Sequence, residues 1–130
     1  MTNTQILLTN DDGIDSPGLR AAVKAVTDLG EITVIAPTSQ QTATGRGMTG
    51  NKQSSLLPVE YSVEGKSIRA FHCDCSPALI VRHSLLTVFR TAKPDLVVSG
   101  INYGENLGAN VTCSGTVGAA LEAASKAIPS

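Results

Sequence analysis

The sequence has few aromatic residues and no long apolar run. Phe, Tyr and Trp together make up 3% of its 130 residues, with no tryptophan, so the core must be built from aliphatic side chains. The apolar runs fall far short of the roughly 20 residues that span a bilayer, and the first residues, MTNTQILLTN, lack the basic start of a signal peptide. Cysteine is present 3 times, an odd number that favours a reducing compartment over a disulfide framework. We therefore expect a cytoplasmic protein that binds no membrane.

Several familiar binding and catalytic patterns are also missing. The formal net charge is -1 and no run of Lys and Arg occurs, which argues against a nucleic-acid surface but leaves room for a single nucleotide. The sequence contains no dinucleotide-binding G-x-G-x-x-G after its first strand, no P-loop and no G-x-S-x-G nucleophile elbow. Apolar residues make up 42% of the chain, which is typical of a folded protein, and the length suits one domain spanning residues 1–130.

Apolar patterns predict strands that alternate with helices. Ser16-Pro17 and Ser76-Pro77 are typical helix starts. We expect strands at Gln5–Thr9, Thr33–Ala36 and Leu96–Ser99, extended segments at Leu56–Val63 and Ile68–Phe71, and helices at Pro17–Leu29, Ala78–Arg90 and Thr116–Ala127. This order indicates an α/β fold with right-handed crossovers and a mainly parallel sheet. A core of three parallel strands would be thin, so we expect either a C-terminally truncated chain or a partner chain that completes the sheet.

Three polar loops follow the predicted strands and should converge at one edge of the sheet. The first contains Asn10-Asp11-Asp12-Gly13, where adjacent carboxylates at a strand end suit Mg²⁺ or Mn²⁺. The alternative interpretation is a solvated turn that starts a helix. The second loop, Thr38–Gly50, carries hydroxyl groups that reach the same edge or belong to a plain linker.

The third loop, Gly100–Ser114, is glycine-rich and long for a compact domain, which is typical of function. Asn102 and Asn106 offer oxygens for a metal or amides for a phosphate, or else simply form turns. The following Ser114-Gly115-Thr116 opens a helix, where free amides suit a phosphate; an ordinary serine N-cap is the alternative.

Other chemically capable residues fit structural roles better. The cysteines match zinc-site spacings poorly, so we interpret His72, Cys73, Cys75 and Cys113 as a histidine with free thiols rather than a metal site. We expect the Glu122 carboxylate to be solvated on the flank of the last helix.

The chain resembles the SurE family of survival-protein nucleotidases and acid phosphatases. The matching stretches, in family order, are residues 6–13 (ILLTNDDG), 16–18 (SPG), 34–37 (VIAP), 42–45 (TATG), 94–102 (PDLVVSGIN), 114–117 (SGTV) and 118–122 (GAALE), together with Gly104, Asn106 and Gly108. The resemblance covers nearly the whole chain. It departs from the family pattern at Cys75-Ser76-Pro77-Ala78-Leu79-Ile80, where the family has an acid two residues after the proline, and in lacking the family's further strands and swapped C-terminal arm.

The resemblance implies a three-layer α/β/α Rossmann-like fold and a metal-dependent phosphomonoesterase that acts on nucleoside 5′-monophosphates. It also implies a homodimer or homotetramer. One divalent ion, Mg²⁺ or Mn²⁺, would be held by Asp11, Asp12, Thr42 and Asn102, with Thr42 standing where the family usually has serine. The residues assigned to phosphate or substrate are Asn10, Gly45, Asn106, Ser114, Gly115 and Thr116.

The mechanism we infer is direct hydrolysis, with Asp11 or Asp12 orienting a water that attacks the phosphorus in line. Three alternatives stay open. One is a nucleotide- or metal-binding module without catalysis. Another is a phosphatase that forms an aspartyl-phosphate, although that class needs Asp-x-Asp rather than adjacent acids. The last is a structural domain that depends on a partner.

Overall fold

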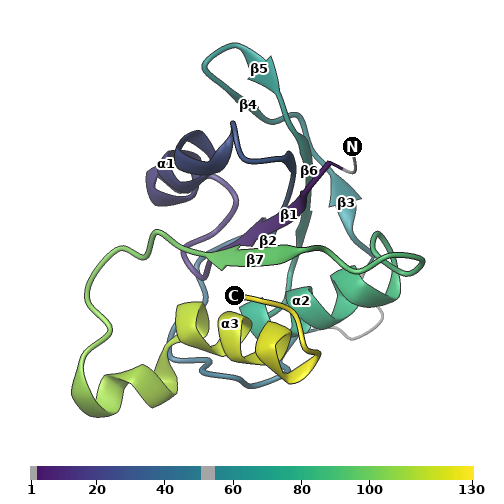
Figure 1. Cartoon of the computed structure of the whole chain (residues 1–130). Coiled ribbons are helices and arrows are strands. Elements are labelled where there is room, and N and C mark those ends of the chain that lie inside the picture. Colours follow the sequence, from purple (N-terminus) through teal and green to yellow (C-terminus); the bar gives the residue numbers. More distant parts are fainter. Residues whose placement is uncertain (1–2, 51–54) are drawn as a thin grey trace.

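The computed structural model describes residues 3–50 and 55–130. In order, the elements are β1 (Gln5–Thr9), α1 (Pro17–Val26), β2 (Glu31–Pro37), β3 (Leu57–Pro58), β4 (Ser62–Val63), β5 (Lys66–Ser67), β6 (Arg69–Cys73), α2 (Pro77–Leu86), β7 (Leu96–Ser99), the 3₁₀ helix η1 (Gly108–Cys113) and α3 (Gly115–Ser125). Figure 1 shows the sheet as a central layer, with α1 on one face and α2 and α3 on the other. The α/β/α fold with a mainly parallel sheet is therefore confirmed.

The main sheet has the strand order β3-β6-β2-β1-β7. β2 and β7 flank β1 in parallel, β6 lies parallel to β2, and only the short edge strand β3 pairs antiparallel. The expectation of three parallel strands was wrong, because β6 is a fourth. Its sequence, RAFHC, overlaps the extended segment expected at Ile68–Phe71, which was not assigned to the parallel sheet, and the hairpin before it is formed by β4 and β5. That hairpin turns at Glu64 and Gly65, both with positive φ.

Apolar side chains on the two faces of the sheet build two cores. Along β1, Ile6 and Leu8 belong to the core under α1, whereas Leu7 belongs to the core under α2 and α3. Such a strand has no polar face, which explains why its sequence reads as a continuous apolar run. Because β2 and β7 both pair parallel with β1, the carboxyl ends of these strands lie at one edge of the sheet, where the polar loops begin.

Each α-helix begins at a serine that caps it. The Oγ atoms of Ser16, Ser76 and Ser114 accept hydrogen bonds from the backbone N–H groups of Leu19, Leu79 and Val117, respectively. All three of these helix starts were predicted, and a proline follows Ser16 and Ser76. The predicted helix ends ran too far, since α1 ends at Val26 and α2 at Leu86. Within the predicted loop of residues 100–115, residues 108–113 form η1, and this segment extends away from the sheet in Figure 1.

Within the described residues, no helix is both long and apolar enough to cross a bilayer.

Candidate metal and phosphate site

The acidic turn after β1 is braced by Asn10, which is fully buried. Its Nδ2 donates to the carbonyl oxygen of Gly13 at 3.0 Å and to Oγ of Ser16 at 2.8 Å, while its Oδ1 accepts from the N–H of Gly13 at 3.2 Å. The predicted role of Asn10 toward substrate stays a prediction. What the contacts establish is that this side chain fixes the turn that presents Asp11 and Asp12.

Asp11 is buried against the N-terminus of α3. Its Oδ1 accepts a hydrogen bond from the hydroxyl of Thr116 at 3.2 Å. Burial, followed by the charge of Asp12, raises the pKa of Asp11 above its ordinary value, whereas the hydroxyl and backbone amide of Thr116 favour the charged form. A negative charge here is therefore partly compensated by the helix end and remains costly.

Asp12 turns toward different partners. Its Oδ2 accepts from the backbone N–H of Tyr103 at 2.7 Å, and its Oδ1 accepts from Nε2 of Gln40 at 3.4 Å. Tyr103 belongs to the loop after β7 and Gln40 to the loop after β2. The adjacent acids thus connect all the segments that sequence reasoning placed at this edge of the sheet.

The other predicted metal ligands lie directly beside these contacts. Thr42 is exposed and follows Gln41, whose backbone N–H donates to the carbonyl oxygen of Asp11 at 2.7 Å. Asn102 precedes Tyr103, and its Nδ2 donates to the carbonyl oxygen of Gly104 at 3.2 Å, which leaves its Oδ1 available. Both chain positions are therefore anchored to an acid by the neighbouring residue.

The predicted phosphate residues are divided between the helix start and the loops. Ser114 caps α3, and Gly115 is so close to the acids that a Cβ on it would lie 2.8 Å from Cβ of Asp11 and 2.9 Å from Oγ1 of Thr44. Asn106 is half-buried in the loop before η1. Gly45 is buried with φ 53°, and its N–H donates to the carbonyl oxygen of Cys113 at 2.9 Å.

Thr44 lies in the loop whose hydroxyls were expected to reach this edge, but no metal or phosphate role was predicted for it from the sequence. Its Oγ1 is buried and has no hydrogen-bond partner within residues 3–50 and 55–130. A buried hydroxyl without a hydrogen bond is costly, so this position favours a ligand that would bond to it. The only signal in the sequence was that Thr44 follows a strand, and threonines in ordinary linkers often do the same.

These residues fit a hard divalent cation. Within the part of the chain that the structure describes, no three His, Cys, Asp or Glu side chains form a metal-binding group. A cation would therefore use the two carboxylates together with neutral oxygens, which is the donor set that Mg²⁺ and Mn²⁺ accept. The costly charge on Asp11 and the orphaned hydroxyl of Thr44 are the observations that favour such an ion.

Four residues outside this cluster were also the subject of predictions. Cys73 and Cys75 are buried free thiols in the core under α2, and Cys113 is an exposed one. The expectation of a solvated Glu122 was wrong. Glu122 is 4% exposed and forms an ion pair with Arg46, a partner too distant in sequence for local patterns to reveal.

Comparison with known proteins agrees with this arrangement. Residues 6–130 match the family model described as Survival protein SurE. The chain belongs to the SurE family. The predicted resemblance is thereby confirmed across almost the whole described fold.

Several SurE relatives are similar over nearly the entire chain. The 5′-nucleotidase SurE of Methanopyrus kandleri is 50% identical over 126 residues, which are 96% of this chain and 46% of that protein. The 5′-nucleotidase SurE 1 of Thermus thermophilus is 47% identical over 97% of this chain and 49% of its own length. The crystal structure of the SurE protein from Aquifex aeolicus superposes with a TM-score of 0.79 at 35% identity, covering 96% of this chain and 48% of that one. The chain therefore spans about half the length of the SurE relatives it matches.

Proposed function

We propose that residues 1–130 form the N-terminal, site-bearing portion of a metal-dependent phosphomonoesterase that hydrolyses nucleoside 5′-monophosphates to nucleoside and phosphate. The observation that carries the proposal is the pair of contacts made by Asp11 and Asp12 with Thr116 and Tyr103. These contacts bring a carboxylate pair, a helix N-terminus and a glycine-rich loop to one place. Relatives named 5′-nucleotidase SurE support the choice of substrate.

In this proposal, Asp11, Asp12, Thr42 and Asn102 hold one Mg²⁺ or Mn²⁺. When bound, the ion offsets the negative charge that builds up on the phosphoryl oxygens. Asn106 and the backbone amides of residues 114–116 bind the remaining phosphate oxygens, as helix N-termini favour anions. Asp11 or Asp12 orients the attacking water, and Gly115 lets the phosphate approach because it carries no side chain.

The decisive experiment measures phosphate release by the purified protein. The substrates are the nucleoside 5′-monophosphates, a 3′-monophosphate and p-nitrophenyl phosphate, each with Mg²⁺, with Mn²⁺ or with EDTA. We expect release from 5′-monophosphates with a divalent ion and none with EDTA. Binding of AMP without release under every metal condition would instead identify a non-catalytic nucleotide-binding module, and a trapped phospho-enzyme would indicate aspartyl-phosphate chemistry.

Assembly and location follow from the same family relationship. We propose a homodimer or homotetramer in the cytoplasm, with no nucleic acid as partner. Light scattering on the purified protein and fractionation of the source cells measure these two properties.

A further inference from the structure

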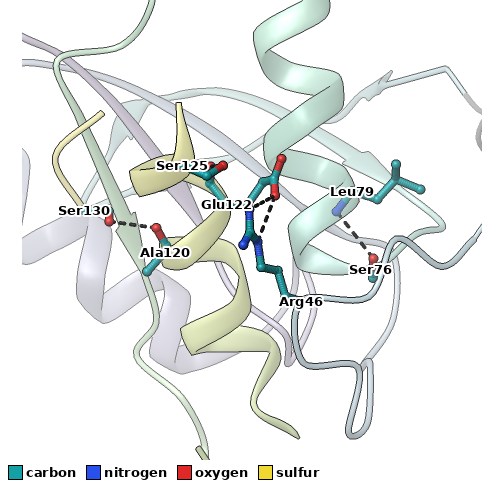
Figure 2. A network of polar contacts seen from close by, with 7 residues as sticks. All are labelled: Arg46, Ser76, Leu79, Ala120, Glu122, Ser125 and Ser130. Carbon is teal, nitrogen blue, oxygen red and sulfur yellow. Dashed lines mark hydrogen bonds and ion pairs between the residues drawn. The ribbon is translucent and has the colours of Figure 1, made fainter. Parts of the chain in front are cut away.

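The ion pair between Arg46 and Glu122 joins two segments that build the candidate site. Figure 2 shows Arg46 reaching from the loop after β2 to Glu122 on α3. Nε and Nη2 of Arg46 each lie 3.1 Å from Oε2 of Glu122. The Glu122 side chain is 5% exposed and the Arg46 side chain 51% exposed, so the carboxylate is buried and the guanidinium closes over it from the surface.

A buried glutamate is an expensive way to stabilise a helix. Taking a carboxylate out of water costs several kcal/mol, and an apolar pair of similar volume is often at least as stable. Glu122 lies on α3 close in sequence to Ala119 and Ala123, both of which are fully buried in the core. An apolar residue at position 122 would suit these surroundings. The ion pair between Glu122 and Arg46 is therefore better explained by its holding the loop of Arg46 in place on α3 than by a gain in stability.

The segment next to Arg46 is pressed against α3 by its main chain. The carbonyl oxygen of Gly45 lies where a Cβ on Gly118 would be, so the two backbones meet with no side chain between them. On the other side of Arg46, the carbonyl oxygen of Gly47 accepts from Oγ of Ser76 at 2.6 Å. Arg46 thus stands in the middle of a stretch held to both α2 and α3.

The same segment leads directly to the metal and phosphate groups. Gln41 is bonded to the carbonyl oxygen of Asp11, and Gly45 to that of Cys113, just before the start of α3. Thr42 and Thr44 lie between these two bonds. A shift of this segment would therefore move both hydroxyls relative to Asp11.

We propose that Arg46 is a positioning residue for this site. Its ion pair with Glu122 fixes residues 41–45 against α3, so that the hydroxyls of Thr42 and Thr44 face the aspartates. The inference rests on the proposed function in one respect, because it takes this place to be a divalent-cation site. Arg46 itself touches neither the acids nor a reacting group.

The test separates positioning from stability with a matched set of variants. Arg46→Met leaves Glu122 buried without its cation. The double variant Arg46→Met/Glu122→Met replaces the pair with apolar side chains of similar size. Arg46→Lys keeps the charge but loses the two-point contact. Lys24→Met is the control, because it removes an ion pair with Glu64 at 2.8 Å whose side chains are 63% and 64% exposed, on the opposite side of the sheet.

Three quantities are measured for each variant: the urea-unfolding free energy, the amide exchange rates of Gln41 and Gly45 without metal, and the affinity for Mn²⁺ alone by electron paramagnetic resonance. We expect Arg46→Met to be destabilised and the double variant to recover the stability of the wild type. In the double variant, Gln41 and Gly45 should still exchange at least roughly tenfold faster, and Mn²⁺ should bind about tenfold more weakly. Arg46→Lys should retain part of the slow amide exchange and part of the Mn²⁺ affinity. The Lys24→Met control should change neither quantity.

The remaining outcomes overturn the proposal. If the double variant regains stability, slow exchange and Mn²⁺ affinity together, the pair serves stability alone. If amide exchange in the double variant is faster but its Mn²⁺ affinity is unchanged, or its affinity is weaker but exchange is unchanged, residues 41–45 do not control the site through Arg46. If the wild type binds no Mn²⁺, there is no cation site to position.

A separate outcome bears on the reaction alone. If Mn²⁺ binding follows the expected pattern but the wild type releases no phosphate from nucleotides, the proposed reaction fails while the positioning role of Arg46 stands.

Discussion

The backbone N–H of Tyr103 lies 2.7 Å from Oδ2 of Asp12, across 91 positions of the sequence. This bond draws Asp12 toward the loop after β7, while Thr116 draws the neighbouring Asp11 toward α3. Two adjacent carboxylates are therefore held apart by donors on different segments. Because those donors are neutral, they orient the acids without cancelling their charge, which is the condition that a cation site needs.

The aspartates should be essential for turnover. Asp11→Asn and Asp12→Asn keep the shape and an oxygen acceptor but remove the charge that binds the ion. We expect phosphate release to fall at least about 100-fold in each. Asp15→Asn is the matched control, because Asp15 is exposed in the same turn, and its rate should equal that of the wild type. Wild-type rates in either of the first two variants would disprove their role.

Asp11→Asn should also stabilise the metal-free protein. Burial and the charge of Asp12 raise the pKa of Asp11, so its ionisation opposes folding above that pKa. In EDTA at neutral pH, we expect the unfolding free energy of Asp11→Asn to exceed that of the wild type. The gain should disappear as the pH falls below the ordinary value of 3.8, since the carboxyl is then neutral in both states. Urea unfolding at several pH values measures it, and an unchanged or lower stability at neutral pH would contradict the prediction.

Divalent ions should raise the melting temperature of the wild type. Mn²⁺ at 100 times its dissociation constant adds about 2.7 kcal/mol if it binds only the folded state. Thermal unfolding with increasing Mn²⁺, and again after EDTA, measures this effect. The Asp11→Asn/Asp12→Asn double variant should show no shift, and an equal shift in that variant would place the ion elsewhere.

Gly118→Ala should disturb the site through the backbone. The added methyl group would collide with the carbonyl oxygen of Gly45, which cannot move without breaking its contact to α3. We expect a loss of about 1–3 kcal/mol in unfolding free energy together with weaker Mn²⁺ binding. Leu121→Ala, at an exposed position of α3, provides the comparison and should have much smaller effects. Full stability and affinity in Gly118→Ala would show that the two backbones are not in contact.

The thiols should differ sharply in reactivity. Cys113 is exposed, whereas Cys73 and Cys75 are each 1% exposed. Burial, together with Cys73, also raises the pKa of Cys75, which keeps its thiol protonated. Titration with a disulfide reagent near pH 8 should detect Cys113 at once and the other two only after unfolding. Cys113→Ser should abolish the rapid phase, and a second rapid thiol would contradict the burial of this core.

Local sequence patterns predicted the parts of the fold that depend on neighbouring residues. The bounds of β1 and β7 were correct because both are short apolar runs, one stopped by Asn10 and the other by Gly100. The starts of α1 and α2 were correct because a serine followed by proline caps a helix by itself. The helix ends were placed too late, since apolar residues such as Leu29 and Phe89 continue the pattern after the backbone has left the helix.

The parts that were missed depend on contacts between distant segments. Glu122 was expected in solvent because it was placed on the flank of the last helix, and its partner Arg46 lies 76 positions away. The hydrogen bond from Tyr103 to Asp12 is donated by the backbone N–H, so the residue type at position 103 could not predict it. The acids, Asn102 and the start of α3 were assigned to one site because parallel strands bring their loops to a common edge, and the contacts between those loops agree with that reasoning.

The link from Asp11 to Thr116 spans 105 positions, and it sets an order for events during synthesis. A ribosome releases the acidic turn early, and the growing chain then carries both aspartates without this helix until residue 116 and the rest of α3 have been made. Only when α3 has emerged can Thr116 contact Asp11 and Glu122 pair with Arg46. In the proposed function, the acid pair is therefore fixed for a cation only after this helix has docked, and a chain cut before Ser114 would keep both acids but lose the Thr116 hydroxyl that holds Asp11.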